Sequence, residues 1–160
     1  MNAKIVYYSY SGNTKGVAER LFKQLKQNNI ECEIAAIHAD EENPKLKPLH
    51  LIDSPDVSQS DVIILASPVR GFSVCPIMKM YLQQLPSLKD KKVIHFVTHH
   101  FPMAWLGGTQ TNKSVKQLLE GKFAKDVQTY VIDWSNKKRE DQIQSMITSI
   151  VATVKTKYKN

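Results

Sequence analysis

The segment Ser9-Tyr10-Ser11-Gly12-Asn13-Thr14 combines three Ser or Thr hydroxyls with one glycine. It follows the apolar run Ile5–Tyr8 and precedes a helical stripe that begins at Val17. A turn between a strand and a helix presents free backbone N–H groups and the positive end of a helix dipole at one point. With hydroxyl donors added, and with Gly12 allowing the backbone to approach closely, such a turn is suited to binding a phosphate.

A plain capped helix start is the alternative for this segment, because Ser, Thr and Asn are ordinary capping residues. The segment lacks the glycine spacing of a dinucleotide loop and the Gly-Lys-Ser/Thr of a nucleoside-triphosphate loop. Its place in the chain favours the phosphate interpretation. It follows the first strand of an alternating pattern, and open α/β sheets bind ligands at the carboxyl ends of their strands.

Two later segments combine glycine with apolar and aromatic side chains. One is Ser67-Pro68-Val69-Arg70-Gly71-Phe72, at the end of a third apolar run. The other is Thr98–Thr109, at the end of a fourth run, and its candidate ligand contacts are Thr98, His99, His100, Phe101, Trp105, Gly107 and Gly108. Together with the Ser9–Thr14 turn, these segments suit a ligand with a flat apolar head and an anionic tail.

The elements that must position these segments alternate along the chain. Five apolar runs predict strands at Lys4–Tyr8, Cys32–Ile37, Val62–Ala66, Val93–Val97 and Thr129–Ile132. Helical patterns between and after them predict helices over 13–28, from Pro76, up to Gly121 and over 143–158. Prolines interrupt His38–Gln59, where a short helix or an extended crossover is expected. The pattern predicts one α/β domain over residues 1–160, with a parallel sheet covered by helices on both faces.

The three segments resemble those of the flavodoxin-like family. Ser9 to Thr14 fits the family's phosphate loop, Ser/Thr-x-Ser/Thr-Gly-Asn-Thr, at every position. Ser67-Pro68-Val69, with the helix-opening Pro76, resembles the second flavin loop, and Thr98–Gly108 is similar to the third. The resemblance covers nearly the whole chain. It implies bound flavin mononucleotide (FMN), a five-stranded parallel sheet in the order 2-1-3-4-5 and, since no long insertion interrupts the last strand, the short-chain type.

The resemblance implies an electron carrier that passes electrons between redox partner proteins, the flavin supplying the redox chemistry. A small NAD(P)H-dependent FMN or quinone reductase is the first alternative. The absence of a second glycine fingerprint favours the carrier, although such reductases bind nicotinamide against the flavin without one. The second alternative is an interaction module that keeps the fold without the flavin.

The chain is basic, with 22 Lys+Arg against 15 Asp+Glu and a net charge of +7. The lysines are spread out and no dense basic tract with interleaved aromatics occurs, which argues against nucleic acid as a partner. A solvated surface or an acidic redox partner is expected. Two cysteines make no disulfide framework, no apolar run reaches the roughly 20 residues that span a bilayer, and no leader is apparent. These features predict a cytoplasmic protein without membrane attachment; its oligomeric state stays open.

Several single residues carry more specific expectations. Arg70 is expected to border the flavin ring, and the candidates for stacking on that ring are Phe72, Phe101 and Trp105. His99-His100 is expected either to contact the ligand or to be exposed; a metal site is disfavoured, because adjacent side chains diverge and no Cys or carboxylate cluster joins them. Trp134, after the fifth run, is expected at the sheet edge or near the ligand.

Overall fold

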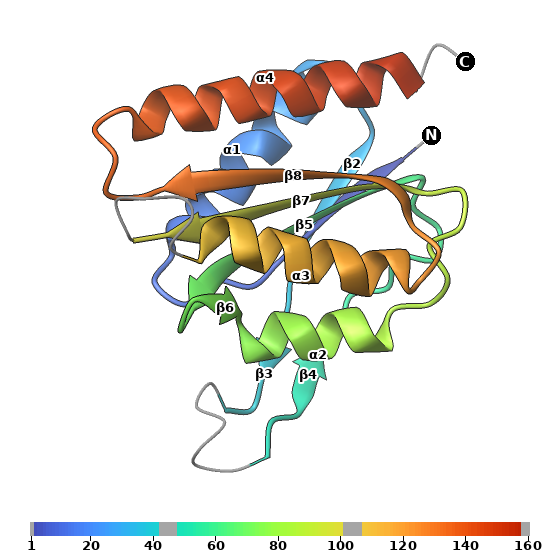
Figure 1. Cartoon of the computed structure of the whole chain (residues 1–160). Helices are drawn as coiled ribbons and strands as arrows, with labels where there is room; N and C mark the ends of the chain where they lie inside the picture. Colours follow the sequence, from blue (N-terminus) through green and yellow to red (C-terminus); the bar gives the residue numbers. More distant parts are fainter. Residues whose placement is uncertain (1, 42–47, 101–106, 158–160) are drawn as a thin grey trace.

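The computed structural model describes residues 2–41, 48–100 and 107–157. Five parallel strands build the central sheet in the order β2-β1-β5-β7-β8 (Figure 1). Their bounds are β1 Ala3–Tyr7, β2 Cys32–Ala36, β5 Val62–Arg70, β7 Lys92–His99 and β8 Lys125–Asp133. Counted among themselves, these strands have the order 2-1-3-4-5, so the predicted flavodoxin-like topology is confirmed.

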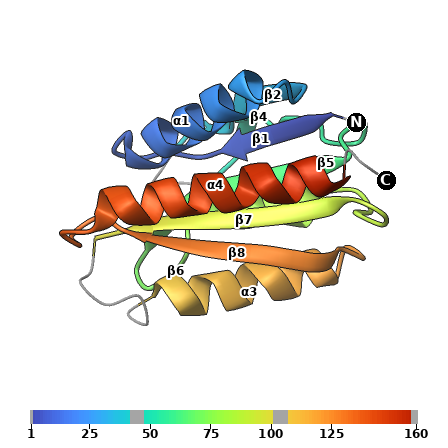
Figure 2. The same cartoon turned by 90° about the horizontal axis from the view of Figure 1, so that it is seen from above.

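Four helices cover the two faces of this sheet. α1 (Asn13–Gln27) and α4 (Arg139–Lys157) lie on one face, where they run side by side (Figure 2). α2 (Pro76–Gln84) and α3 (Gly108–Glu120) contact each other on the opposite face. The helices begin and end close to the predicted positions, because the residues that start and stop them are local: Pro76 occupies the first turn of α2, and Gly121 follows α3.

Alternation along the strands divides the core into two layers. In β5, Ile64 packs under α1 and α4, whereas Ile63 and Leu65 pack under α2 and α3. β1 repeats the pattern with Ile5 on the first side and Val6 on the second. Successive side chains of a strand point to opposite faces, so a sheet covered on both sides needs the continuous apolar runs seen in the sequence.

The segment between β2 and β5 contains two short strands that the sequence analysis did not predict. β3 (His38–Ala39) pairs antiparallel with β4 (Leu51–Asp53). The described part of this segment, residues 38–41 and 48–59, contains no helix, which agrees there with the extended one of the two predicted forms. A hydrogen bond between His38 Nδ1 and Asp53 Oδ2, which lie 2.6 Å apart, links β3 to β4.

β5 and β7 are longer than their apolar runs. The short strand β6 (Ser73–Val74) pairs antiparallel with the end of β5, Val69 facing Val74 and Arg70 facing Ser73. β5 continues four residues past Ala66 because β7 pairs with Ser67 and Pro68 and the hairpin strand β6 pairs with the last two. Ser67-Pro68-Val69 is therefore strand rather than the predicted turn, and the turn lies at Gly71-Phe72. None of the described helices is long and apolar enough to cross a membrane.

Candidate functional site

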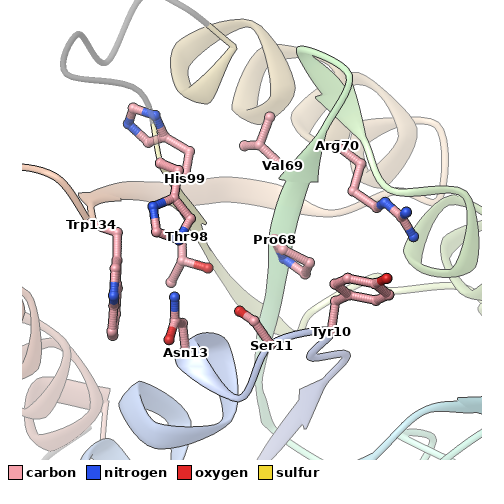
Figure 3. A pocket seen from close by; sticks show the side chains of 10 residues that line it. Tyr10, Ser11, Asn13, Pro68, Val69, Arg70, Thr98, His99 and Trp134 are labelled. Atoms are coloured by element: carbon pink, nitrogen blue, oxygen red, sulfur yellow. The ribbon is translucent and has the colours of Figure 1, made fainter.

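A pocket of about 320 Å³ lies where β1, β5, β7 and β8 end (Figure 3). Ten of the described residues line it: Tyr10, Ser11, Asn13, Pro68, Val69, Arg70, Thr98, His99, His100 and Trp134. Nine of these belong to the three segments that the sequence analysis selected, and Trp134 is the tenth. The sheet topology brings them together because the carboxyl ends of parallel strands meet at one edge.

The Ser9–Thr14 turn is shaped by hydrogen bonds to its own first residue. Ser9 Oγ accepts from the backbone N–H of Gly12 at 3.1 Å and from that of Lys15 at 3.2 Å. Gly12 has a φ of +88°, and a Cβ there would meet nothing within 4 Å. The glycine is therefore required by the backbone conformation, and the turn has N–H donors that already converge on one oxygen. An anionic oxygen fits such a group of donors.

Thr14 has a different place from the one predicted. It is buried, and its hydroxyl lies 2.8 Å from that of Thr98. This pair links the start of α1 to the end of β7. Thr98 lines the pocket and Thr14 does not, so Thr14 holds two pocket segments together instead of forming part of the lining.

Arg70 and Tyr10 close one end of the pocket. The Arg70 guanidinium lies over the Tyr10 ring, 4.5 Å from its centroid, in a cation–π arrangement (Figure 3). Gly71 and Phe72 form the hairpin turn next to them with φ values of +55° and +63°. Phe72 is 48% exposed and is not among the lining residues, so the structure does not place it as a wall of this pocket.

His99 and His100 differ in environment although they are adjacent. His99 is buried and lines the pocket, whereas His100 lines it from an exposed position. Burial lowers the pKa of His99, with His100 acting in the same direction and the Asp133 carboxylate opposing both. The His99 imidazole is therefore neutral near pH 7. Phe101 and Trp105, the two other predicted aromatic contacts, lie outside the described residues.

Gly107 and Gly108 do not line the pocket but permit the close packing behind it. A Cβ on Gly107 would lie 3.0 Å from the Phe72 Cα, and Gly107 has a φ of +105°. A Cβ on Gly108 would lie 2.7 Å from Val131 Cγ1 and 3.3 Å from His99 Cδ2. These glycines let the start of α3 approach both the hairpin and β7, so their role in the site is indirect.

Trp134 supplies an aromatic wall opposite the Arg70–Tyr10 pair (Figure 3). The Arg139 guanidinium lies 4.6 Å from the Trp134 ring centroid, and Arg139 Nη1 donates to the Trp134 carbonyl oxygen at 2.6 Å. The sequence predicted that Trp134 lies either at the sheet edge or near the ligand, and the structure places it in the pocket lining. The signal that could have selected it was its position directly after the last strand, at the same edge as the other segments.

Below the pocket lies a chain of buried polar groups that the sequence analysis missed. Asn112 Nδ2 donates to the Tyr130 carbonyl at 3.0 Å, which leaves Asn112 Oδ1 to accept from His95 Nδ1 at 2.8 Å. His95 Nε2 is then the acceptor for the Ser67 hydroxyl at 3.4 Å. Ser67, which was predicted to contact the ligand, is fully buried, and its hydroxyl points to His95. A histidine inside the apolar run Val93–Val97 was the available signal.

Burial sets the protonation state of the His95 imidazole in this hydrogen-bonded network. His95 is fully buried, and burial lowers its pKa to about 4, although the hydrogen bond with Asn112 acts in the opposite direction. The imidazole is neutral at pH 7, which agrees with one donating and one accepting nitrogen. Among the described residues, no group of three or more His, Cys, Asp or Glu side chains is arranged to hold a metal ion.

Comparisons with known proteins agree with this fold. The flavodoxin 2 of Bacillus cereus superposes with a TM-score of 0.67 at 14% identity, covering 96% of this chain and 99% of that one. Rubredoxin oxygen:oxidoreductase from Desulfovibrio gigas gives 0.68 at 16% identity, covering 99% of this chain but 37% of that larger one. The azoreductase of Bacillus anthracis gives 0.63 at 11% identity, with 96% and 98% covered. No curated protein matches the sequence significantly.

The family assignment rests on the sequence match over most of the chain. A model of the flavodoxin domain matches residues 4–131, which span β1 to most of β8 and include three of the four chain segments that line the pocket. The matched region also contains the Ser9–Thr14 turn, where the family pattern was first seen. The chain belongs to the flavodoxin domain family.

Proposed function

We propose that this chain binds FMN in the pocket at the carboxyl edge and passes electrons between redox partner proteins. The observation that carries the proposal is the pocket itself, which joins Tyr10, Ser11 and Asn13 of the Ser9–Thr14 turn to apolar and aromatic walls. A ligand with an anionic end and a flat apolar end matches that distribution. Flavin supplies the redox chemistry when bound, and the protein positions it.

The phosphate would be held by the Ser9–Thr14 turn. Ser11 and Asn13 line the pocket and can donate hydrogen bonds, and the N–H groups of Gly12 and Lys15 fix the shape of the same turn by donating to Ser9 Oγ. The ring would lie among Pro68, Val69, Thr98, His99 and Trp134, all of which line the pocket (Figure 3). Arg70 is the one Arg or Lys side chain among the described residues of the lining.

An NAD(P)H-dependent FMN or quinone reductase is the second candidate. Two structural neighbours with the same fold are named as an azoreductase and an oxygen oxidoreductase, so the fold is compatible with enzymes as well as carriers. The two candidates differ in one measurable property. A reductase oxidises NAD(P)H without a protein partner, whereas a carrier is reduced only when a partner is supplied.

An absorption spectrum of the purified protein, with extraction and identification of the pigment, tests the flavin. Titration of the apoprotein with FMN and with flavin adenine dinucleotide tests the preference for a terminal phosphate. Ser11→Ala should weaken FMN binding about tenfold through one lost bond to a charged group, and Ser145→Ala, on the exposed side of α4, is the matched control. Colourless protein that takes up neither flavin would favour the interaction module.

The proposed redox partner is an acidic protein in the cytoplasm. The net charge of +7 motivates this, because opposite charge speeds encounter at low salt. The electron-transfer rate with the true partner should fall as ionic strength rises, since the screening length is about 8 Å at physiological salt. A rate that is independent of salt would indicate that the basic surface is merely solvated.

A further inference from the structure

A second cavity, of about 400 Å³, lies on the face covered by α2 and α3 and shares no lining residue with the carboxyl-edge pocket. We call it the α2–α3 groove, and it is lined by Ser73, Val74, Lys79, Ser114, Gln117 and Leu118. These residues come from β6, from the first half of α2 and from the middle of α3. Its volume is within the range of sites that bind small molecules.

The polar part of the groove favours an anion. Lys79 brings a positive charge, and Ser114 and Gln117 can donate hydrogen bonds, whereas none of the six described lining residues carries a carboxylate. Lys79 is exposed, and within the described part of the chain its ammonium group makes no ion pair. A lysine ammonium with hydroxyl and amide donors beside it is a common way to bind phosphate.

Neither α2 nor α3 places a carboxylate against Lys79. The one carboxylate of α3, that of Glu120, lies 3.8 Å from the Lys116 ammonium on its own helix. α2 contains no acidic residue. Ser73 contributes less to anion binding, because its hydroxyl already donates to the Arg70 carbonyl at 3.2 Å.

The other part of the groove is apolar. Val74 is buried, and Leu118 is partly buried against the same core cluster. A bare phosphate leaves these side chains and most of the 400 Å³ without contact. A ligand that carries a ring or another apolar group next to its phosphate uses both parts of the site.

The groove and the pocket lie on two sides of one hairpin. Val69 and Arg70 line the pocket, and their antiparallel partners Val74 and Ser73 line the groove. Strand neighbours are about 5 Å apart, so a ligand in the groove contacts the hairpin that forms one wall of the pocket.

We infer that the α2–α3 groove binds a small molecule that bears a phosphate, through Lys79 and Ser114, with an apolar group against Val74 and Leu118. The inference does not depend on whether the pocket holds a flavin, because the two sites have separate lining residues. It assigns to Lys79 a role distinct from attraction of a protein partner.

Binding of adenosine 5′-monophosphate to the full chain, followed by calorimetry and by amide chemical shifts, tests the inference. We expect saturable binding, with shifts at Ser114, Leu118 and Lys79, and at least tenfold weaker binding of adenosine. Lys79→Gln should weaken binding at least tenfold. Lys89→Gln, which removes the same charge from an exposed loop, should leave it unchanged.

Ser114→Ala gives a second variant that keeps the lysine and should weaken binding several-fold. An FMN titration of Lys79→Gln and of the wild type, run in parallel, separates this inference from the proposed function, since Lys79 lies outside the pocket. Four results would overturn it: no saturable binding, equal affinity for adenosine, equal loss in Lys79→Gln and Lys89→Gln, or shifts confined to Ser9–Thr14.

Discussion

Two sets of polar side chains of similar composition lie at successive depths below the carboxyl edge of the sheet. The rim set, Ser9, Ser11 and Asn13, borders the turn at the start of α1 and contacts solvent. The buried set, Ser67, His95 and Asn112, is sealed between β5, β7 and α3. Both sets contain hydroxyl and amide groups. They differ in the source of their hydrogen-bond partners: water is available to the rim set, whereas the buried set depends on other protein groups.

Water can replace a lost partner in the rim set but cannot reach the buried set. Removing a buried partner leaves the remaining groups without a hydrogen bond and costs their desolvation. Removing a rim group changes the stability of the free protein little, but it lowers the affinity for a ligand that would accept a hydrogen bond from that group. The same residue types therefore serve stability in one place and recognition in the other.

The largest effect is expected for His95→Leu. The substitution leaves the Ser67 hydroxyl and Asn112 Oδ1 buried without their partner, so the free energy of unfolding should fall by about 2–5 kcal/mol. Urea denaturation measures it. Ser11→Ala is the comparison from the rim set and should change stability by less than about 0.5 kcal/mol. Equal losses in the two variants would contradict the distinction between the sets.

Acid should act on the buried set through His95. Its folded pKa of about 4 is below the unfolded value of about 6.5, so the folded state binds fewer protons. The stability that this histidine contributes is present above pH 6.5 and is lost as the pH falls toward 4, up to about 3 kcal/mol. Denaturation curves from pH 7 to pH 4 measure this loss. His95→Leu should remove this component, and parallel curves for the variant and the wild type would show that His95 is not its source.

Ser9→Ala should give an intermediate result within the rim set. Ser9 Oγ accepts two backbone N–H groups, at 3.1 and 3.2 Å, but water can reach them when it is gone. We expect a stability loss of about 0.5–1 kcal/mol and a roughly tenfold loss of FMN affinity. Denaturation and apoprotein titration measure the two quantities on one preparation. A stability loss as large as that of His95→Leu would place Ser9 with the buried set.

The smallest effect is expected for Arg70→Glu, on the flavin potential. A cation in the lining stabilises the negative charge of reduced flavin, and exposure reduces the contribution to about 1 kcal/mol. The potential of the second electron should therefore fall by roughly 40 mV in the variant. Spectroelectrochemistry measures it, with Lys89→Glu as a control for net charge. An unchanged or higher potential would mean that Arg70 does not tune the flavin.

The fold could be predicted from the sequence because its signals are local. Each of the five predicted apolar runs overlaps a strand of the central sheet, and buried strands need such runs wherever helices cover both faces. The ends of the strands were less predictable. β5 reaches Arg70 because the short strand β6, which has no apolar run of its own, folds back and pairs with it. The pairing of β3 with β4 depends on residues more than ten positions apart.

For the site, the sequence alone determined the Ser9–Thr14 turn and the edge of the sheet at which the ligand segments meet, since both follow from strand–helix alternation. Only the tertiary structure decided which way each side chain faces: Ser67 turns to His95, Phe72 lies outside the lining, and Trp134 lies inside it. Strand pleating and contacts between distant elements set those directions. The directions of these side chains therefore cannot be predicted from residue type or from spacing along the chain.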